Sequence, residues 1–398
     1  MKRVELLLPA GNLEKLKYAI DYGADAVYVG GKILSLRAQA SNFSLDDIKE
    51  GVEYAHNRNK KVYVTVNVIP RSHEIHLVKD YLISLDNIGV DGIIVSSPAI
   101  IFIAKEYTKL HVSVSTQCSI SSSYSANFYK NNGADRVVLS RELSLDEIEY
   151  LKNAADIEIE VFIHGGMCSA YSGRCTLSNY FSLRDANSGG CAHSCRWNYD
   201  VYQNGSKLNN EFFRMGSKDL VSIREIKRLV EIGVDSLKIE GRMKSISYIS
   251  TVAYTYRKLL DDIYNNELKP YEYYEYLLGD ATNREAASGF LNHEAGKDET
   301  LYVSSDTEAN KNFLGIVLSY EDGVCTLEVR NYFENNESIE IISPSLELKH
   351  SRITNLKRDG ELTDAARHAL EVVTFECDTI LKKGDLIRRL KWNQLLSQ

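Results

Sequence analysis

The sequence of 398 residues lacks a long hydrophobic run, and no apolar stretch approaches the roughly 18 residues of a membrane span. The apolar stretch near the amino terminus, in Met-Lys-Arg-Val-Glu-Leu-Leu-Leu-Pro, is too short for the core of a signal peptide. We therefore expect a cytoplasmic protein with no membrane partner. A net charge of −8 disfavours a protein that coats nucleic acid, but it is compatible with an enzyme that has a local basic groove.

Three common motifs of enzymes are also missing. No Gly-x-Gly-x-x-Gly follows the first apolar segment, and no Gly-x-Ser-x-Gly occurs. The nearest approach to His-Glu-x-x-His begins at His293 and lacks the second histidine, so it cannot chelate zinc as that motif does. These absences disfavour a dinucleotide-binding fold, an α/β-hydrolase and a zinc protease of this kind. A catalytic pair of His193 with a cysteine stays open as an alternative.

The sequence does contain a repeated pattern in its first 240 residues. Gly-x-Asp occurs at 23–25, 89–91, 133–135 and 233–235, each time after a helix-like stretch and before an apolar strand. The glycine can adopt the left-handed conformation that ends a helix, and the chain then turns into the next strand. Apolar strands joined by helical crossovers predict a parallel sheet that is covered by helices.

The fold class predicted from this pattern is α/β. Eight βα units over about 250 residues have the size of a closed (β/α)8 TIM-like barrel, with an open doubly wound sheet as the alternative. We expect the barrel at 1–268 with a Cys-rich insertion at 165–215, a connecting segment at 269–311, and a small β-barrel or sandwich domain at 312–398. A hairpin turn is predicted at Asp322-Gly323. The strands are expected near residues 4–8, 26–29, 61–67, 92–96, 110–116, 136–140, 157–164 and 236–240.

Four of the seven cysteines lie close together between the seventh and eighth predicted strands, as Cys168-x6-Cys175-x15-Cys191-x3-Cys195. Four thiolates can bind either zinc or an iron–sulfur cluster. Zinc ribbons favour Cys-x2-Cys pairs, which are missing here, whereas the surrounding glycines let the backbone approach a bulky cluster. We therefore predict a [4Fe–4S] cluster on these four residues, with structural zinc and unligated thiols as alternatives. The other cysteines are expected to be small, mostly buried apolar residues: Cys118, Cys325 and Cys377.

Polar residues follow the predicted strands at their carboxyl ends, where the active site of a TIM barrel lies. Any one of them is more typical of a structural or solvated residue, but their convergence on one rim indicates a functional site. Arginine in this group suits carboxylate or phosphate ligands, because its planar fork binds two oxygens. The candidate catalytic residues are Arg37, Asn67, Gln117, Arg141, Glu142, His164, Lys238, Glu240 and Arg242.

The segment at 160–178, Glu-Val-Phe-Ile-His-Gly-Gly-Met-Cys-Ser-Ala-Tyr-Ser-Gly-Arg-Cys-Thr-Leu-Ser, closely resembles the signature of the U32 peptidase family. Further segments that resemble the family occur at 5–12, 23–31, 195–197 and 238–245, so the resemblance covers nearly the whole chain. One departure is Cys118, where relatives carry a small residue. This residue places a fifth thiol near the expected rim.

The resemblance implies oxygen-independent hydroxylation rather than proteolysis. One branch of the family forms 5-hydroxyuridine at the wobble position of tRNA and another hydroxylates a cytidine of ribosomal RNA, both with prephenate; a third hydroxylates the ubiquinone ring. It also implies an iron–sulfur cluster on the four clustered cysteines. This chain is most similar to the tRNA branch, so tRNA and prephenate are the expected partners, with a paralogous U32 subunit as a further candidate. The alternatives are a collagenase-like peptidase and a hydroxylase of a quinone precursor.

Overall fold

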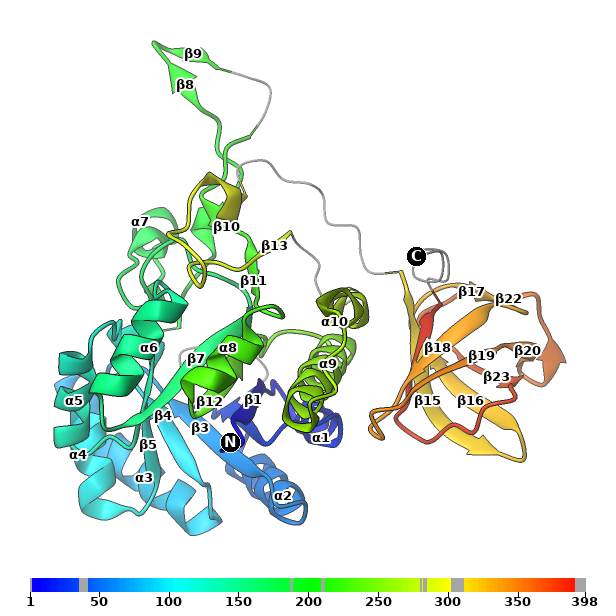
Figure 1. Ribbon diagram of the computed structural model, residues 1–398, viewed down its shortest axis with the longest axis horizontal. Helices are drawn as coiled ribbons and strands as arrows, with labels where there is room; N and C mark the ends of the chain where they lie inside the picture. The colour runs from blue at the N-terminus through cyan, green and yellow to red at the C-terminus, as the bar shows by residue number, and fades with distance from the viewer. Residues whose placement is uncertain are drawn as a thin grey trace.

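The computed structural model describes residues 2–35, 42–186, 189–208, 212–279, 281, 285–301 and 311–390. Eight parallel strands form a closed ring in the order β12-β1-β2-β3-β4-β5-β6-β7, and β7 pairs with β12 to complete it (Figure 1). This arrangement confirms the predicted TIM-like barrel. The barrel strands are β1 (Glu5–Pro9), β2 (Ala26–Gly30), β3 (Lys61–Val66), β4 (Gly92–Val95), β5 (His111–Val114), β6 (Arg136–Val138), β7 (Glu158–Gly165) and β12 (Ser236–Ile239).

Helices cover the outside of the barrel and bury the apolar, outward-facing strand residues. The glycines of the repeated Gly-x-Asp pattern end helices as predicted: Gly89 (φ +88°) and Gly233 (φ +81°) are the left-handed C-caps of α3 and α8. Within the described residues, no helix combines the length and the apolar composition needed to cross a bilayer. The helices are α1 (Leu13–Asp21), α2 (Leu45–His56), α3 (Ile75–Ile88), α4 (Pro98–Tyr107), α5 (Ser123–Asn131), α6 (Leu145–Ala154), α8 (Ile226–Ile232) and α9 (Ile246–Asn265).

The long connection between β7 and β12 forms a separate layer at the carboxyl end of the barrel (Figure 1). It contains the short helix α7 (Leu177–Ser182) and a hairpin of β8 (Tyr202–Gln203) and β9 (Ser206–Lys207) that projects away from the barrel. β11 (Asp219–Val221) then returns along β7 in the antiparallel direction. The Cys-rich insertion is therefore joined to the barrel through the edge of its seventh strand.

The segment at 269–311, for which the sequence predicts only a connection, is partly structured. Helix α10 (Tyr271–Leu278) packs on α9 and buries Tyr274, Leu277 and Leu278, which lie on one face at helical spacing. β13 (Ala286–Ala287) pairs with β11, and β14 (Thr300–Leu301) pairs with β10 (Gly216–Ser217). This part of the chain therefore packs with the barrel and its insertion.

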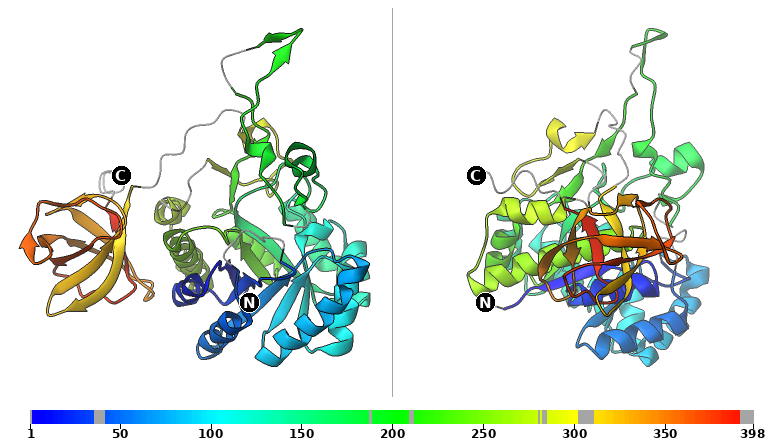
Figure 2. Two further views of the ribbon diagram at one scale, coloured as in Figure 1. Left: turned by 180° about the vertical axis from the view of Figure 1, so that it is seen from behind. Right: turned by 90° about the vertical axis from the view of Figure 1, so that its right-hand side faces the viewer.

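The carboxyl-terminal domain is an antiparallel sheet with its own apolar core, as predicted. Its hairpin turns at Asp322 (φ +48°) and Gly323 (φ +86°), so both central residues have the left-handed conformation that a tight hairpin requires. Figure 2 shows this domain beside the barrel, on the side of α9 and α10. The sheet contains β15 (Phe313–Glu321), β16 (Val324–Val329), β18 (Ser338–Ile342), β19 (Leu348–Arg352), β20 (Thr354–Arg358), β21 (Glu361–Leu362), β23 (Val372–Glu376) and β24 (Leu386–Arg389).

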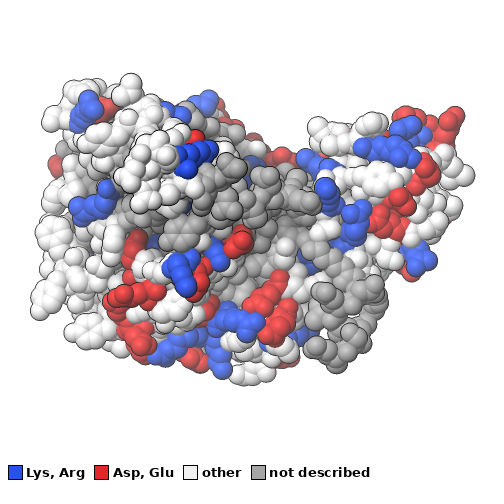
Figure 3. Space-filling view, turned by 90° about the horizontal axis from the view of Figure 1, so that it is seen from above, with Lys and Arg blue, Asp and Glu red and all other residues white. Residues whose placement is uncertain are grey.

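The two domains meet through buried polar contacts. The Tyr22 hydroxyl donates to the carbonyl oxygen of Gly384 at 2.8 Å. The Arg388 side chain is buried, donates to the Leu277 carbonyl oxygen at 2.8 Å and pairs with the buried Glu340. Arg388 belongs to the basic run that begins at Lys382, and its burial withdraws it from any surface that could contact RNA. Seen from above (Figure 3), basic and acidic side chains are interleaved on this domain.

Reversing the charge of single residues in the basic run therefore distinguishes the buried, structural Arg388 from the exposed lysines. We expect Arg388→Glu to lower the free energy of unfolding by about 3–5 kcal/mol, because it leaves the buried Glu340 beside a second carboxylate. The matched pair Lys382→Glu and Lys383→Glu, both at exposed positions, should change it by less than about 0.5 kcal/mol. Urea unfolding measures both values. Equal stability of Arg388→Glu and the unaltered protein would contradict the assigned interface.

Candidate functional site

Asn67 and Gln117 lie together at the carboxyl ends of β3 and β5. The Asn67 amide nitrogen donates to the Gln117 side-chain oxygen at 2.8 Å, and the Ser115 hydroxyl donates to the same oxygen at 3.1 Å. The loop that carries the cysteines rests on this pair: a Cβ atom at Gly173 would lie 2.2 Å from the Gln117 carbonyl oxygen. Only glycine allows this approach. The predicted rim residues thus also form the seat of the cysteine loop.

Arg141 and Glu142 follow β6 and face the start of the same loop. The Arg141 guanidinium donates to the Gly166 carbonyl oxygen at 2.6 Å and lies 3.9 Å above the Phe162 ring. The Glu142 carboxylate accepts a hydrogen bond from the Ser140 hydroxyl. Arg141 therefore fixes the backbone just before Cys168, and Glu142 places a carboxylate beside it.

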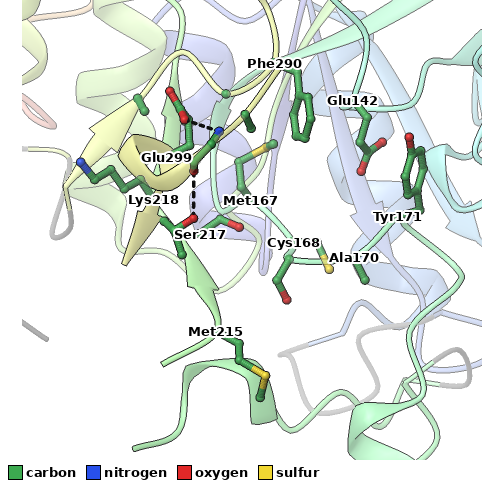
Figure 4. A pocket seen from close by; sticks show the side chains of 16 residues that line it. Glu142, Met167, Cys168, Ala170, Tyr171, Met215, Ser217, Lys218, Phe290 and Glu299 are labelled. Atoms are coloured by element: carbon green, nitrogen blue, oxygen red, sulfur yellow. Dashed lines mark hydrogen bonds between the residues drawn. The ribbon is translucent and has the colours of Figure 1, made fainter. Parts of the chain in front are cut away.

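A pocket of about 290 Å³ opens next to these residues. Figure 4 shows the Glu142 carboxyl between the rings of Phe290 and Tyr171, with the Cys168 side chain near one edge of the pocket. The Lys218 ammonium points away and pairs with Glu285 at 3.1 Å. The lining residues are Glu142, Met167, Cys168, Ser169, Ala170, Tyr171, Met215, Ser217, Lys218, Ala287, Gly289, Phe290, Ala295, Gly296, Glu299 and Thr300.

The sequence does not predict the wall of the pocket that comes from residues 287–300. These residues reach the rim because β13 and β14 pair with strands of the insertion, which lie about 67 to 85 residues earlier in the sequence. The sequence signal for this wall is the segment Ser288-Gly-Phe290, which resembles a motif that follows the barrel in the U32 family.

The four clustered cysteines lie on the loop beside this pocket. Cys168 and Cys191 are exposed, while Cys175 and Cys195 are half-buried. Although Cys168 is exposed as a whole residue, burial of its thiol raises the pKa of that group, and the nearby Cys195 and Cys175 thiols raise the pKa further. In the described part of the chain, no three His, Cys, Asp or Glu side chains form a ready-made metal site. Four thiols provide the ligands that a thiolate-bound cluster requires, and the neighbouring glycines allow the backbone to approach it.

Lys238 belongs to a buried charge network below the rim. Its ammonium pairs with the Glu160 carboxylate at 2.6 Å. Arg136 pairs with Glu160 at 3.1 Å and with Glu5 at 2.6 Å. Burial would raise the pKa of Glu160, but the cations of Lys238 and Arg136 hold the pKa below its ordinary value. Burial lowers the pKa of Lys238 and the Glu160 carboxylate opposes this shift, so the two side chains depend on each other on the inside of the barrel.

Sequence reasoning missed Glu160, Arg136 and Glu5 as partners of Lys238. The sequence does contain one signal for this network. Glu158 and Glu160 alternate with apolar residues in β7, and charged residues at every second position face the inside of a barrel.

Arg242 and Glu240 lie at the end of β12. The Arg242 guanidinium is buried against Gly30, and it donates to the Asn42 side-chain oxygen at 2.7 Å and to the Ser35 hydroxyl at 3.0 Å. The Glu240 carboxylate lies near Gly166. Glu240 thus approaches the cysteine loop, whereas Arg242 holds the segment that follows β2 and contacts Thr65 of β3 at 3.4 Å. Arg37 lies outside the described residues.

His164 does not join the rim. The pairing of β7 with β12 shifts register after Phe162, so His164 lies opposite Ile239, which faces the helices. Its Nδ1 lies 3.2 Å from the Tyr256 hydroxyl of α9, and its ring packs against Tyr248. Burial lowers the pKa of His164 to about 3, with a smaller contribution from Lys244. The side chain is therefore a neutral residue of the interface between barrel and helix.

Comparison with known families accounts for nearly all of the chain. Residues 11–301 match the family described as "Peptidase family U32", and residues 309–388 match the "Peptidase family U32 C-terminal domain". The boundary between the two matches falls between β14 and β15. The pocket wall at 287–300 thus lies inside the first match, together with the barrel and the cysteines.

Three curated relatives carry different names. A Bacillus subtilis protein named "tRNA hydroxylation protein P1" is 43% identical, with 98% of this chain and 96% of that protein covered. The Escherichia coli "23S rRNA 5-hydroxycytidine C2501 synthase" is 39% identical over 66% of this chain and 40% of that protein. A Porphyromonas gingivalis protein named "Collagenase" is 34% identical, with 65% of each chain covered.

Proposed function

Because the chain belongs to peptidase family U32, we propose that it is an RNA hydroxylase and that it forms 5-hydroxyuridine at the wobble position of tRNA with prephenate as the hydroxyl donor. The observation that carries the proposal is the 43% identity, over 98% of this chain, to a protein named for tRNA hydroxylation. The rRNA enzyme and the collagenase match about two thirds of the chain.

The pocket beside Cys168 has the chemistry to hold a pyrimidine ring. Phe290 and Tyr171 offer aromatic faces on either side of Glu142, and Met167 adds a polarizable apolar contact. The Glu142 carboxylate can accept the N3–H of uracil, so one edge of the ring would be read while its faces are stacked. An anticodon loop presents such a base at low cost, because it is already single-stranded.

We propose that Cys168, Cys175, Cys191 and Cys195 hold a [4Fe–4S] cluster, which would supply single-electron chemistry next to the pocket. The chain positions these thiols through two contacts of the loop. Arg141 fixes the Gly166 carbonyl oxygen, and the Gln117 backbone seats Gly173. Arg141 has five N–H donors and so can also bind a carboxylate of prephenate, whereas Glu142 and Glu299 would repel a dicarboxylate inside the pocket itself.

Hydrolysis of peptides is less well supported by the rim. An activated nucleophile needs a base within hydrogen-bonding reach, and His164, the histidine among the candidate catalytic residues of the rim, contacts Tyr256 and Tyr248 instead. Its pKa of about 3 also leaves it a weak base at neutral pH. Activity on denatured collagen is therefore the outcome that would favour the older family name.

The direct test compares tRNA nucleosides from a deletion strain with and without a plasmid copy of the gene. We expect 5-hydroxyuridine and its derivatives to disappear in the deletion strain and return on complementation. The purified protein, prepared without oxygen, is tested in parallel on denatured collagen with and without a chelator. Unchanged tRNA nucleosides in the deletion strain would contradict the proposal. Loss of hydroxycytidine from rRNA, or of a hydroxylated quinone ring, in that strain would redirect it.

Glu142 provides a sharper test of the pocket. We expect Glu142→Ala to lower hydroxylation of tRNA roughly 10- to 100-fold, because a hydrogen bond from the base to a charged acceptor is lost. Glu106→Ala, an exposed glutamate on the outer helix α4, is the matched control and should leave the rate unchanged. The rate of 5-hydroxyuridine formation is measured at saturating RNA and at low RNA. An unchanged rate for Glu142→Ala would place the base elsewhere.

A further inference from the structure

The insertion exposes several large apolar side chains, which a folded protein ordinarily buries. Tyr180 is 84% exposed and Leu183 is 94% exposed, on and directly after α7. A cluster of exposed apolar groups on one layer of a protein indicates a surface that binds another molecule. We refer to it as the aromatic surface, and its main residues are Tyr171, Tyr180, Leu183, Trp197, Tyr202 and Phe212.

Several contacts hold the aromatic surface in place around the cysteine loop. The Phe181 ring packs edge-on against Trp197, with 6.4 Å between centroids, and against Tyr199 at 5.7 Å. The Trp197 indole donates to the Ala192 carbonyl oxygen, next to Cys191. Leu183 adopts a left-handed conformation (φ +54°), which costs a branched residue about 1–3 kcal/mol and here displays its side chain to solvent. Trp197 is therefore fixed beside the cysteine loop, and Tyr171, which lines the pocket, connects the aromatic surface to the edge of the pocket.

The charge of the insertion is opposite to that of the whole protein. Residues 168–218 contain six basic and three acidic residues, in a chain whose net charge is −8. Arg174 is exposed between Cys168 and Cys175, while Lys207 lies on the projecting hairpin. Figure 3 looks onto the end of the molecule that carries the insertion, where uncharged surface predominates and basic side chains are scattered within it. A surface that is both apolar and basic favours a ligand that carries several negative charges and also has apolar faces.

We propose that the aromatic surface binds the unpaired bases of an RNA loop by stacking, and that Arg174 and its basic neighbours contact the adjoining phosphates. The inference rests on the proposed function and names the surface that presents the substrate to the pocket. Single-stranded nucleic acids are bound by aromatic side chains set among basic groups, because every base has a face that can stack. One base of the loop enters the pocket at Cys168, and its neighbours lie on the aromatic surface.

The experiment measures binding of a fluorescent stem–loop RNA with an anticodon-loop sequence to the full-length protein, prepared without oxygen. Tyr180→Ala and Tyr202→Ala are each expected to weaken binding roughly 5- to 100-fold, with an unchanged dependence on salt. Arg174→Ala should weaken binding and flatten the salt slope by about 0.7, the value for one phosphate contact to a single strand. A duplex RNA of the same length should be insensitive to the tyrosine variants.

The matched controls are Tyr124→Ala and Tyr150→Ala, which remove equally exposed tyrosines (89% and 75%) from the outer helices α5 and α6. These variants should bind the stem–loop like the unaltered protein. The proposal is overturned if all four tyrosine variants bind alike. It is also overturned if the protein is a dimer that Tyr180→Ala dissociates, because the surface would then bind a second copy. Normal RNA binding together with normal hydroxylation in Tyr180→Ala and Tyr202→Ala would reject only the role of the aromatic surface. Absence of hydroxylation by the unaltered protein would reject the proposed function.

Discussion

Alanine at any one of Cys168, Cys175, Cys191 or Cys195 is expected to abolish tRNA hydroxylation and to remove most of the bound iron. Losing one thiolate leaves an iron site open, and the cluster becomes labile. The Cys175 and Cys195 thiols both lie within electrostatic range of Cys168, which lines the pocket. The measurements are iron and acid-labile sulfide per chain in protein prepared without oxygen, together with 5-hydroxyuridine in tRNA from the complemented deletion strain.

Two of the other three cysteines provide the controls for this prediction. Cys325 is buried in the core of the carboxyl-terminal domain, so Cys325→Ala should keep iron and activity and cost on the order of 1 kcal/mol of stability. Cys118→Ala is the more demanding control, because this thiol lies at the rim near the loop that carries the four clustered cysteines. It is half-buried and contacts the Ser96 carbonyl oxygen. If all four cluster variants kept iron and restored 5-hydroxyuridine, the iron–sulfur proposal would fail. One zinc without sulfide in the unaltered protein would favour a structural site.

The sequence predicts the barrel well because its signals are local. Each Gly-x-Asp marks the end of a helix and the start of a strand, and Gly89 and Gly233 have the required left-handed conformation. The hairpin at Asp322-Gly323 is local for the same reason. The placement of Cys168 just after β7 follows directly from the strand assignment, because barrel loops after the carboxyl ends of strands form the active site.

The features that sequence reasoning missed depend on contacts between distant segments. His164 is turned toward α9 by a register shift in β7, and no periodicity in the sequence marks the extra residue. Arg388 is buried because it pairs with Glu340 of its own domain and meets Leu277 across the domain interface, although Lys382 and Lys383 of the same basic run are exposed. The wall of the pocket comes from a segment without apolar periodicity that pairs with the insertion. In each case the role of the residue depends on a contact with a segment that is distant in the sequence.

The same distinction applies to Lys238, and its partner Glu160 yields a prediction with a large effect on stability. We expect Glu160→Gln to lower the free energy of unfolding at neutral pH by about 3–5 kcal/mol, because Lys238 and Arg136 would remain charged and buried without it. The folded state lowers the pKa of Glu160, so the ionised carboxylate stabilises the protein above its unfolded pKa of about 4.3. This contribution is lost as the pH falls through the lower, folded pKa.

Urea unfolding at several pH values measures both effects, and a double variant provides the control. Glu160→Met together with Lys238→Met removes the pair in similar volume, while Arg136 keeps Glu5 and Glu158 as partners. The double variant should therefore be much closer in stability to the unaltered protein than Glu160→Gln is, because uncompensated buried charge is the costly element. Its stability should also fall less steeply on acidification. If the double variant were as unstable as Glu160→Gln, packing of these side chains rather than charge pairing would support the inside of the barrel.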